Sequence, residues 1–209
     1  MPYDIPVLSV PDLTLRPHHH ADIDRVLSRS VDPLSQRWTT VPLEYTREMA
    51  AEYVEAISVP QEKEISWALE VNGTYAGTLD LRFKGANSGD LGFVTAPEYR
   101  GQGLMSRAVG LAVAHALDTL GWDVVSWSAN AGNVASYKTV WRNGFPPPIA
   151  VPHLLQHRGK LVEGWVSSLA AGDPREPSGA WAKWNDVAAR LPGVSPVRLP
   201  WESSGHRCG

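Results

Sequence analysis

The sequence predicts a mixed α/β fold, with one mostly antiparallel sheet of about seven strands that contains a parallel pair and is flanked by helices. Two patterns predict it. Residues 66–83 alternate apolar and polar side chains around an Asn72-Gly73 turn, which is typical of a β-hairpin. Residues 90–145 then follow a strand, helix, strand, helix order, and that order places two strands in parallel.

The chain before the hairpin predicts a strand and two helices. Residues 13–16 alternate as a short strand, and residues 22–30 carry apolar side chains at helical spacing. Thr46 is typical of a helix N-cap, and apolar residues follow it on one face as far as Ile57. We therefore expect two helices to lie over the sheet.

The chain after the hairpin changes period. Residues 90–94 predict a third antiparallel strand, and residues 104–120 predict a long buried helix that ends at Gly121. The segments that follow predict a strand at 122–128, a helix at 134–141, and a closing hairpin formed by 149–155 and 161–169.

The C-terminal part differs in composition. We divide the chain into a domain of residues 1–172 and a Pro-, Gly- and Ser-rich tail of residues 173–209. One amphipathic helix is predicted in this tail by Trp181, Trp184, Val187 and Leu191, and it would pack on the domain or on a second subunit.

Composition narrows the class of protein. The chain has 209 residues, 43% of them hydrophobic and 20% charged, as in soluble globular proteins. A net charge of −3 gives no basic field for nucleic acid, and no apolar run is long enough for a membrane span. Because the start also lacks a signal-peptide pattern, we expect a cytoplasmic protein. The adjacent residues His18 to His20 point in different directions, so no metal site is expected.

A glycine-containing turn before the long helix carries the main functional signal. Gly101 and Gly103 precede the helix N-terminus, where unpaired N–H groups and the positive end of the helix dipole favour an anion. Arg100 adds positive charge, and the Ser106 hydroxyl can donate to a phosphate oxygen. The segment therefore predicts a pyrophosphate cradle, although a turn that needs glycine for its backbone alone is the other interpretation.

The segment from Pro97 to Leu104 resembles the acyl-CoA pyrophosphate loop of the GNAT N-acetyltransferases, written Q/R-x-x-G-x-G/A. The resemblance implies a GNAT fold with a splayed parallel pair, acetyl-CoA as co-substrate, and transfer of an acetyl group to a primary amine. Met105 stands where the pattern has a small residue. The coenzyme-binding residues implied here are Arg100, Gly101, Gln102, Gly103, Leu104, Met105 and Ser106.

A second block supports the same family. Asn133 and Ser136, followed by Asn143-Gly144-Phe145, resemble the N-x-x-S … G-F helix of the Rim-type (ribosomal-protein N-acetyltransferase-like) subgroup. Residues 38–46 resemble the subgroup's loop between its first two helices, which borders the acceptor site. Three residues are therefore implied at that site, namely Trp38, Glu44 and Tyr45. The resemblance covers residues 12–170, and members of the family are often homodimers.

Acyl transfer to an amine needs a polarised thioester carbonyl and a base for the amine. The splay implied by the family would leave N–H groups near Phe93 and Val94 unpaired, free to polarise the carbonyl. Asp90 points to the same side of its strand as Val94, which makes it the first candidate base, with Asp80 among the reserves. A carboxylate at the start of a strand can instead cap a turn or pair with a lysine.

The thiolate also needs a proton. Many family members supply it from a tyrosine, where this chain has Val140. Ser136 is then the hydroxyl that matches the family pattern, and Asn133 would hold the pantetheine arm. Ser136 could equally cap its own helix, and Tyr137 is a less well aligned substitute.

Three interpretations of the function stay open. The first is an N-acetyltransferase that acts on a protein N-terminal α-amine or on a small-molecule amine. The second is a CoA-binding module without turnover, suggested by Met105 and Val140. The third is a transferase that uses a larger acyl-CoA such as succinyl-CoA.

Overall fold

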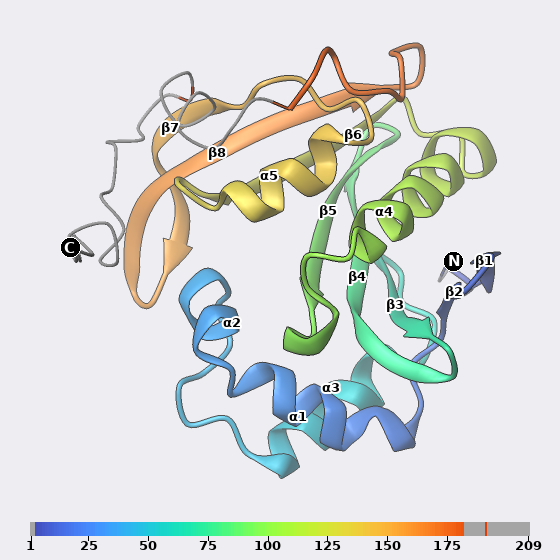
Figure 1. The fold of residues 1–209 in the computed structure, drawn as a ribbon, viewed down its shortest axis with the longest axis vertical. Coiled ribbons are helices and arrows are strands. Elements are labelled where there is room, and N and C mark those ends of the chain that lie inside the picture. Colours follow the sequence, from blue (N-terminus) through green and yellow to red (C-terminus); the bar gives the residue numbers. More distant parts are fainter. Residues whose placement is uncertain (1–2, 182–190, 192–209) are drawn as a thin grey trace, which may run out of the picture.

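The structure is a computed structural model of the chain that describes residues 3–181 and residue 191. Within this part, eight strands form a single sheet in the order β1-β2-β3-β4-β5-β6-β8-β7 (Figure 1). The strands are β1 (Leu8–Val10), β2 (Leu13–Arg16), β3 (Glu64–Val71), β4 (Thr74–Gly85), β5 (Ser88–Thr95), β6 (Val124–Asn130), β7 (Ile149–His157) and β8 (Lys160–Ala170). The mixed α/β prediction is therefore confirmed. The strand that the sequence pattern did not indicate is β1, which pairs with β2.

One pair of strands is parallel and the other neighbouring pairs are antiparallel. The parallel pair is β5 with β6, and its register runs from Ser88 opposite Val124 to Leu91 opposite Trp127. Beyond that point β5 continues to Thr95 and β6 continues to Asn130 without pairing with each other. The two strands therefore part halfway along the sheet, as the family resemblance implied.

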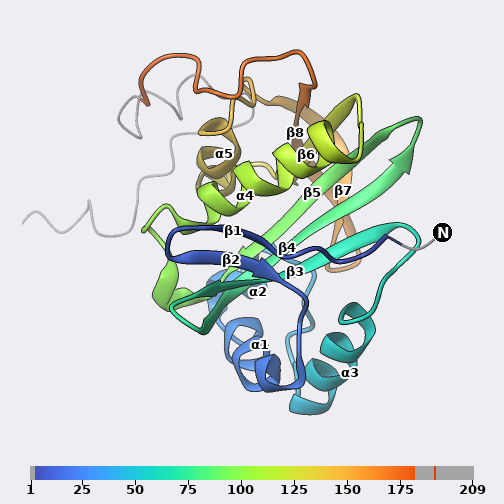
Figure 2. The ribbon, with the colours of Figure 1, turned by 90° about the vertical axis from the view of Figure 1, so that its right-hand side faces the viewer.

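Five α-helices cover the sheet in the described residues. They are α1 (Ile23–Ser30), α2 (Pro33–Trp38), α3 (Arg47–Ile57), α4 (Leu104–Ala114) and α5 (Val134–Trp141). Figure 2 shows α4 and α5 together on one side of the sheet and α1 to α3 on the other. The sequence pattern did not indicate α2, which begins at Pro33 after the N-cap Asp32, whose carboxylate accepts from the Ser35 N–H at 2.8 Å.

The long helix predicted at 104–120 has the expected extent but not a uniform geometry. It is α-helical to Ala114 and continues as a π-helical turn, His115–Thr119, in which Leu120 N–H donates to His115 at 3.0 Å. Trp181 packs edge-on against Trp141 with ring centroids 4.7 Å apart. The predicted tail helix, with Trp184 and Val187, lies outside the described residues.

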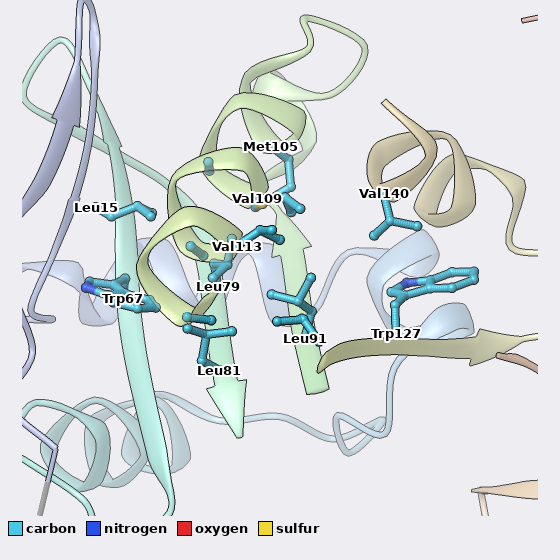
Figure 3. Packing of buried hydrophobic residues seen from close by; sticks show 14 of the residues in the cluster. Leu15, Trp67, Leu79, Leu81, Leu91, Met105, Val109, Val113, Trp127 and Val140 are labelled. Atoms are coloured by element: carbon cyan, nitrogen blue, oxygen red, sulfur yellow. The ribbon is translucent and has the colours of Figure 1, made fainter. Parts of the chain in front are cut away.

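The apolar core explains which side chains face which layer. Met105, Val109 and Val113 of α4 point at the strands, where they meet Leu79 and Leu91 (Figure 3). Burial of each such side chain contributes about 1.5–3 kcal/mol. A smaller cluster, in which Ala68 and Tyr75 meet α1 and α3, fills the opposite side.

The two faces of β4 carry different residues. Leu79 and Leu81 belong to the core under α4, so strand alternation places the even-numbered residues from Thr78 to Arg82 on the side covered by α1 and α3.

No helix in the described part is long and apolar enough to cross a membrane.

Candidate active site

Two cavities meet where β5 and β6 part. The α4 cavity, of about 330 Å³, lies at the start of α4 and along α5. The α1 cavity, of about 490 Å³, lies on the side covered by α1 to α3. Six residues line both cavities: Trp38, Thr39, Phe93, Val94, Asn133 and Ser136. The two cavities are thus halves of one passage through the gap in the sheet.

The glycine turn forms one wall of the α4 cavity. Gly103 is the N-cap of α4 with φ 77° and ψ 0°, a left-handed conformation that favours glycine. The first hydrogen bond of the helix joins Arg107 N–H to the Gly103 carbonyl at 3.2 Å. The N–H groups of Leu104, Met105 and Ser106 come before that bond, so they are the donors that a helix N-terminus leaves for an anion.

The side chains of this turn have different surroundings. Ser106 is buried and lines the α4 cavity, whereas Gln102 is exposed and lines neither cavity. Met105 is also buried, and its side chain points into the core, where its terminal methyl lies beside Gly77 (Figure 3). The side chain of Met105 is therefore directed away from the N–H donors of the turn.

Arg100 lines the α4 cavity but already has an anionic partner. It donates to Asp32 at 2.6 Å and to the Ser35 hydroxyl at 2.9 Å, and so fastens the turn to α2. Burial alone would raise the pKa of Asp32, but the hydrogen bonds from Arg100 and Ser35 lower it, so the carboxylate stays charged. Much of the charge of Arg100 is thus neutralised within the protein.

Two other cations in the α4 cavity were not indicated by the sequence pattern. Arg142 follows α5 and lies beside the turn, with its Nη1 atom 3.6 Å from the position of a Cβ built on Gly103. Lys138, one helical turn earlier, lines the same cavity. Within the described residues, neither forms an ion pair with a carboxylate. Their i, i+4 spacing on one helix was the available signal.

The backbone of β5 offers a donor inside the gap. Ala96 N–H donates to Ala76 of β4 at 2.9 Å, and N–H groups alternate in direction along an antiparallel strand. Val94 N–H consequently points at β4, while Phe93 N–H points toward the side that β6 has left. Phe93 therefore has the geometry of a carbonyl-polarising donor, and Val94 contributes the cavity wall instead.

Ser136 lies in the gap on the first turn of α5. Its backbone N–H is capped by Asn133 at 3.3 Å, and its hydroxyl oxygen accepts from the indole N–H of Trp127 at 3.0 Å. Because an indole N–H can only donate, the Ser136 hydroxyl keeps its own proton for another acceptor. The serine side chain thus serves Trp127 and the cavities, while Asn133 caps the helix.

The family's tyrosine position, which is Val140 here, and the alternative Tyr137 both lie in the core. Val140, at the family's tyrosine position, is fully buried (Figure 3). Tyr137 is 3% exposed and lies between Trp127 and Trp181 with its ring tilted against both, and burial raises the pKa of its hydroxyl to about 12.

Asp90 and Asp80 lie on neighbouring strands with different partners. Asp90 lines neither cavity, and its carboxylate pairs with Arg82 at 2.7 Å and with Lys84 at 3.2 Å. It therefore forms the lysine pairing that the sequence left open as its alternative role. Asp80 lines the α1 cavity and accepts from the Ser66 hydroxyl at 2.6 Å. Burial raises the pKa of Asp80 against the opposing effects of Ser66 and Arg82.

The three loop residues implied at the acceptor site differ in whether they line a cavity. Trp38 lines both cavities, with the guanidinium of Arg37 4.8 Å from the centre of its ring. Tyr45 lines the α1 cavity and donates to the Met49 carbonyl at 3.4 Å. Glu44 is exposed and lines neither cavity.

Known proteins share this architecture. The family model of the acetyltransferase (GNAT) domain matches residues 12–146. No curated protein matches the chain in sequence.

Solved structures show the same fold. An acetyltransferase (GNAT family) from Bacillus anthracis has a TM-score of 0.73 at 13% identity, over 80% of this chain and 100% of that one. Mycobacterium smegmatis RimJ in complex with CoA-disulfide has a TM-score of 0.67 at 15% identity, over 79% and 86%. The Microcin C7 self immunity acetyltransferase MccE, in complex with acetyl-CoA and AMP, has a TM-score of 0.70 at 13% identity, over 77% and 93%.

Proposed function

This chain belongs to the acetyltransferase (GNAT) family, and from that premise we propose that it transfers an acetyl group from acetyl-CoA to a primary amine. The observation that carries the proposal is the passage through the sheet, whose two cavities share six lining residues at the point where β5 and β6 part. A thioester held in the gap would be open to the coenzyme side and to the acceptor side at once.

We assign the coenzyme to the α4 cavity. The N–H groups at the start of α4 would bind its diphosphate, and Arg142 and Lys138 would add charge from α5. Asn133 would border the pantetheine arm at the edge of the gap. The buried position of the Met105 side chain argues against one of the two reasons for a module without turnover.

We assign the reacting groups to the gap itself. Phe93 N–H would donate to the thioester oxygen, where negative charge develops during attack. Asp80, whose pKa burial raises, would accept the proton of the amine from the α1 side. Ser136 would give its hydroxyl proton to the departing thiolate, because Trp127 already donates to the oxygen. The amine nitrogen thus gains the acetyl group and loses a proton to Asp80, and the thiolate gains a proton from Ser136. Solvent would return a proton to Ser136 and take up the proton that Asp80 releases.

The order of events around the acceptor follows from these positions. We propose direct attack of the amine on the thioester, without an acyl-enzyme, because the two cavities meet in the gap and would bring the amine and the thioester together there. Both acceptor classes, a protein N-terminus and a small-molecule amine, remain within this proposal.

Two measurements test the proposal. Isothermal titration with CoA should show binding at one site per chain, and a thiol reagent should detect CoA release from acetyl-CoA when an amine is present. Binding without release for any amine would favour the module without turnover. If CoA is released faster from succinyl-CoA than from acetyl-CoA, the donor is a larger acyl-CoA and not acetyl-CoA.

The remaining expectations are part of the same proposal. We infer a catalytic domain of residues 1–172, a cytoplasmic location and a homodimer, on the basis of composition and of the family resemblance. Sedimentation of the full chain would measure its oligomeric state directly.

A further inference from the structure

Arg29 is a buried cation in the wall of the α1 cavity. It extends from α1 and is 4% exposed. Its Nε atom donates to the Tyr75 hydroxyl at 3.0 Å, and Nη2 lies 3.5 Å from the Thr78 hydroxyl. The guanidinium carbon also lies 5.5 Å from the centre of the Tyr53 ring. All of these partners are uncharged.

The same layer of the protein contains an arginine that shows the usual arrangement. Arg16 donates to Asp22 at 2.8 and 2.9 Å and to Glu70 at 2.5 Å, so its charge is matched by two carboxylates. In the part of the chain that the structure describes, no carboxylate lies within 4.0 Å of the Arg29 guanidinium. Burial of an ion is costly unless an opposite charge compensates it, and arginine cannot become neutral. Asp80, in the same cavity, feels the charge of Arg29, which partly offsets the rise that burial causes in the pKa of Asp80, but it does not bond to the guanidinium. The position is therefore suited to an anion from outside the chain.

The location of Arg29 identifies which ligand would supply that anion. Thr78, beside the guanidinium, and Asp80, the proposed base, are two residues apart on the same face of β4, roughly 6–7 Å along the strand. An anion at Arg29 and an amine at Asp80 would thus occupy the same cavity. Arg82, the next residue on this face, is paired with Asp90.

We propose that the acceptor is a small amino acid, an amine with a carboxylate a few bonds from its nitrogen, and that Arg29 binds this carboxylate. The inference rests on the proposed function, since it uses Asp80 as the place of the amine. A planar guanidinium matches a carboxylate in geometry as well as in charge. A cavity of about 490 Å³ suits a small ligand.

The test compares acids with their uncharged counterparts. The twenty amino acids and their carboxamides are assayed as acceptors of acetyl groups from acetyl-CoA, with release of CoA as the readout. We expect at least one acid to exceed its carboxamide in kcat/KM by about 10- to 100-fold, as for a charged hydrogen bond. Arg29→Met should remove this preference, whereas Arg47→Met, at an exposed arginine of α3, should keep it.

Stability provides a second readout that a purely structural arginine would not give. Tyr75 also bonds Thr78 at 2.8 Å, so Arg29→Met leaves its hydroxyl with a partner. Without ligand, the variant should unfold at the same temperature as the wild type or above it. The preferred amino acid should raise the unfolding temperature of the wild type and of Arg47→Met, but not that of Arg29→Met.

The outcomes separate the inference from the proposed function. Transfer without preference for acids, or a preference that survives in Arg29→Met, would overturn the role of Arg29 and leave the transferase intact. A peptide that begins Ala-Asp carries a carboxylate in its second side chain. If its kcat/KM exceeds that of every free amino acid, the acceptor is a protein N-terminus and not a small amino acid. Absence of both CoA binding and transfer would reject the transferase, and amino acids that also fail to stabilise the wild type would then reject the anion site as well.

Discussion

The two halves of the passage are built in different ways. The α4 cavity takes its anion donors from backbone N–H groups in one short turn, where Gly103 leads into α4. The α1 cavity takes its chemistry from side chains on separate elements, with Arg29 on α1, Tyr53 on α3 and Asp80 on β4. A backbone site tolerates changes of most side chains but not of glycine conformation, whereas a side-chain site depends on single functional groups.

The largest effect is expected at Asp80. Asp80→Asn should lower kcat/KM by about 100-fold or more and leave the Kd for CoA unchanged, because it removes the proposed base but not the proposed coenzyme site. Since burial raises the pKa of Asp80, the rate of the wild type should fall with decreasing pH at a higher pH than an ordinary aspartate would give. A pH profile of kcat/KM measures both.

Asp90→Asn is the matched comparison on the neighbouring strand. Asp90 as the base stays a prediction, and the pair of variants decides between the two carboxylates. A larger loss of turnover in Asp90→Asn than in Asp80→Asn would return that role to Asp90.

Low pH should lower the free energy of unfolding through His18. His18 is buried between Tyr53 and Tyr75, and burial lowers its pKa to about 4 from the model-compound value of 6.5. Between these pH values the unfolded chain binds more protons, so the free energy of unfolding should fall by about 3 kcal/mol as the pH drops from 6.5 to 4.

Urea unfolding at a series of pH values measures this loss. His18→Phe should flatten the pH dependence in that window, and His20→Gln, at an exposed histidine, should keep it. An equally steep loss in His18→Phe would place its origin elsewhere in the fold.

The glycine turn of the α4 cavity should lose affinity for CoA when its backbone conformation is changed. Gly103→Val forces a β-branched residue into a left-handed conformation, and we expect CoA binding to weaken by about 2 kcal/mol, or roughly 30-fold. Titration calorimetry measures the change. Gly159→Val, at another positive φ in the β7–β8 turn, is the control for strain alone and should bind CoA normally. Unchanged binding in Gly103→Val would reject the cradle.

The smallest effect is expected at Ser136. Ser136→Ala removes a proton donor from a thiolate that leaves readily, so kcat should fall by about tenfold while the Kd for CoA holds. Ser168→Ala, on the exposed side of β8, controls for the loss of a hydroxyl. A weaker Kd with unchanged kcat would instead make Ser136 a binding residue.

The sequence indicated the residues of the α4 cavity, which we assign to the coenzyme, far better than those of the α1 cavity, which we assign to the acceptor. Gly101 and Gly103 could be interpreted because their chemistry depends only on their position before a helix. The choice between Asp80 and Asp90 could not, because it depends on Arg82 and Lys84 reaching across from β4 to one of the two. Arg29 could not be identified from the sequence, because its property of interest, a buried guanidinium with no bonded carboxylate, appears only in the folded structure.

The secondary structure shows the same limit. The hairpin, the parallel pair and α5 follow from long patterns, and the family and fold class are confirmed. The helix α2, of six residues, is too short for a periodic pattern, and the cap at Asp32 alone marks its start. The role that we propose for Ser136 also depends on a tertiary contact, the hydrogen bond that its hydroxyl accepts from Trp127.

The ion pair between Arg100 and Asp32 limits how far the glycine turn can be treated as a portable motif. The two residues are 68 positions apart, and the same carboxylate also caps α2. A graft of residues 97–106 into a foreign scaffold would carry the glycines but leave their arginine without its anchor. Transplantation would therefore have to move Asp32 and α2 as well, which makes the smallest transferable unit a pair of distant segments.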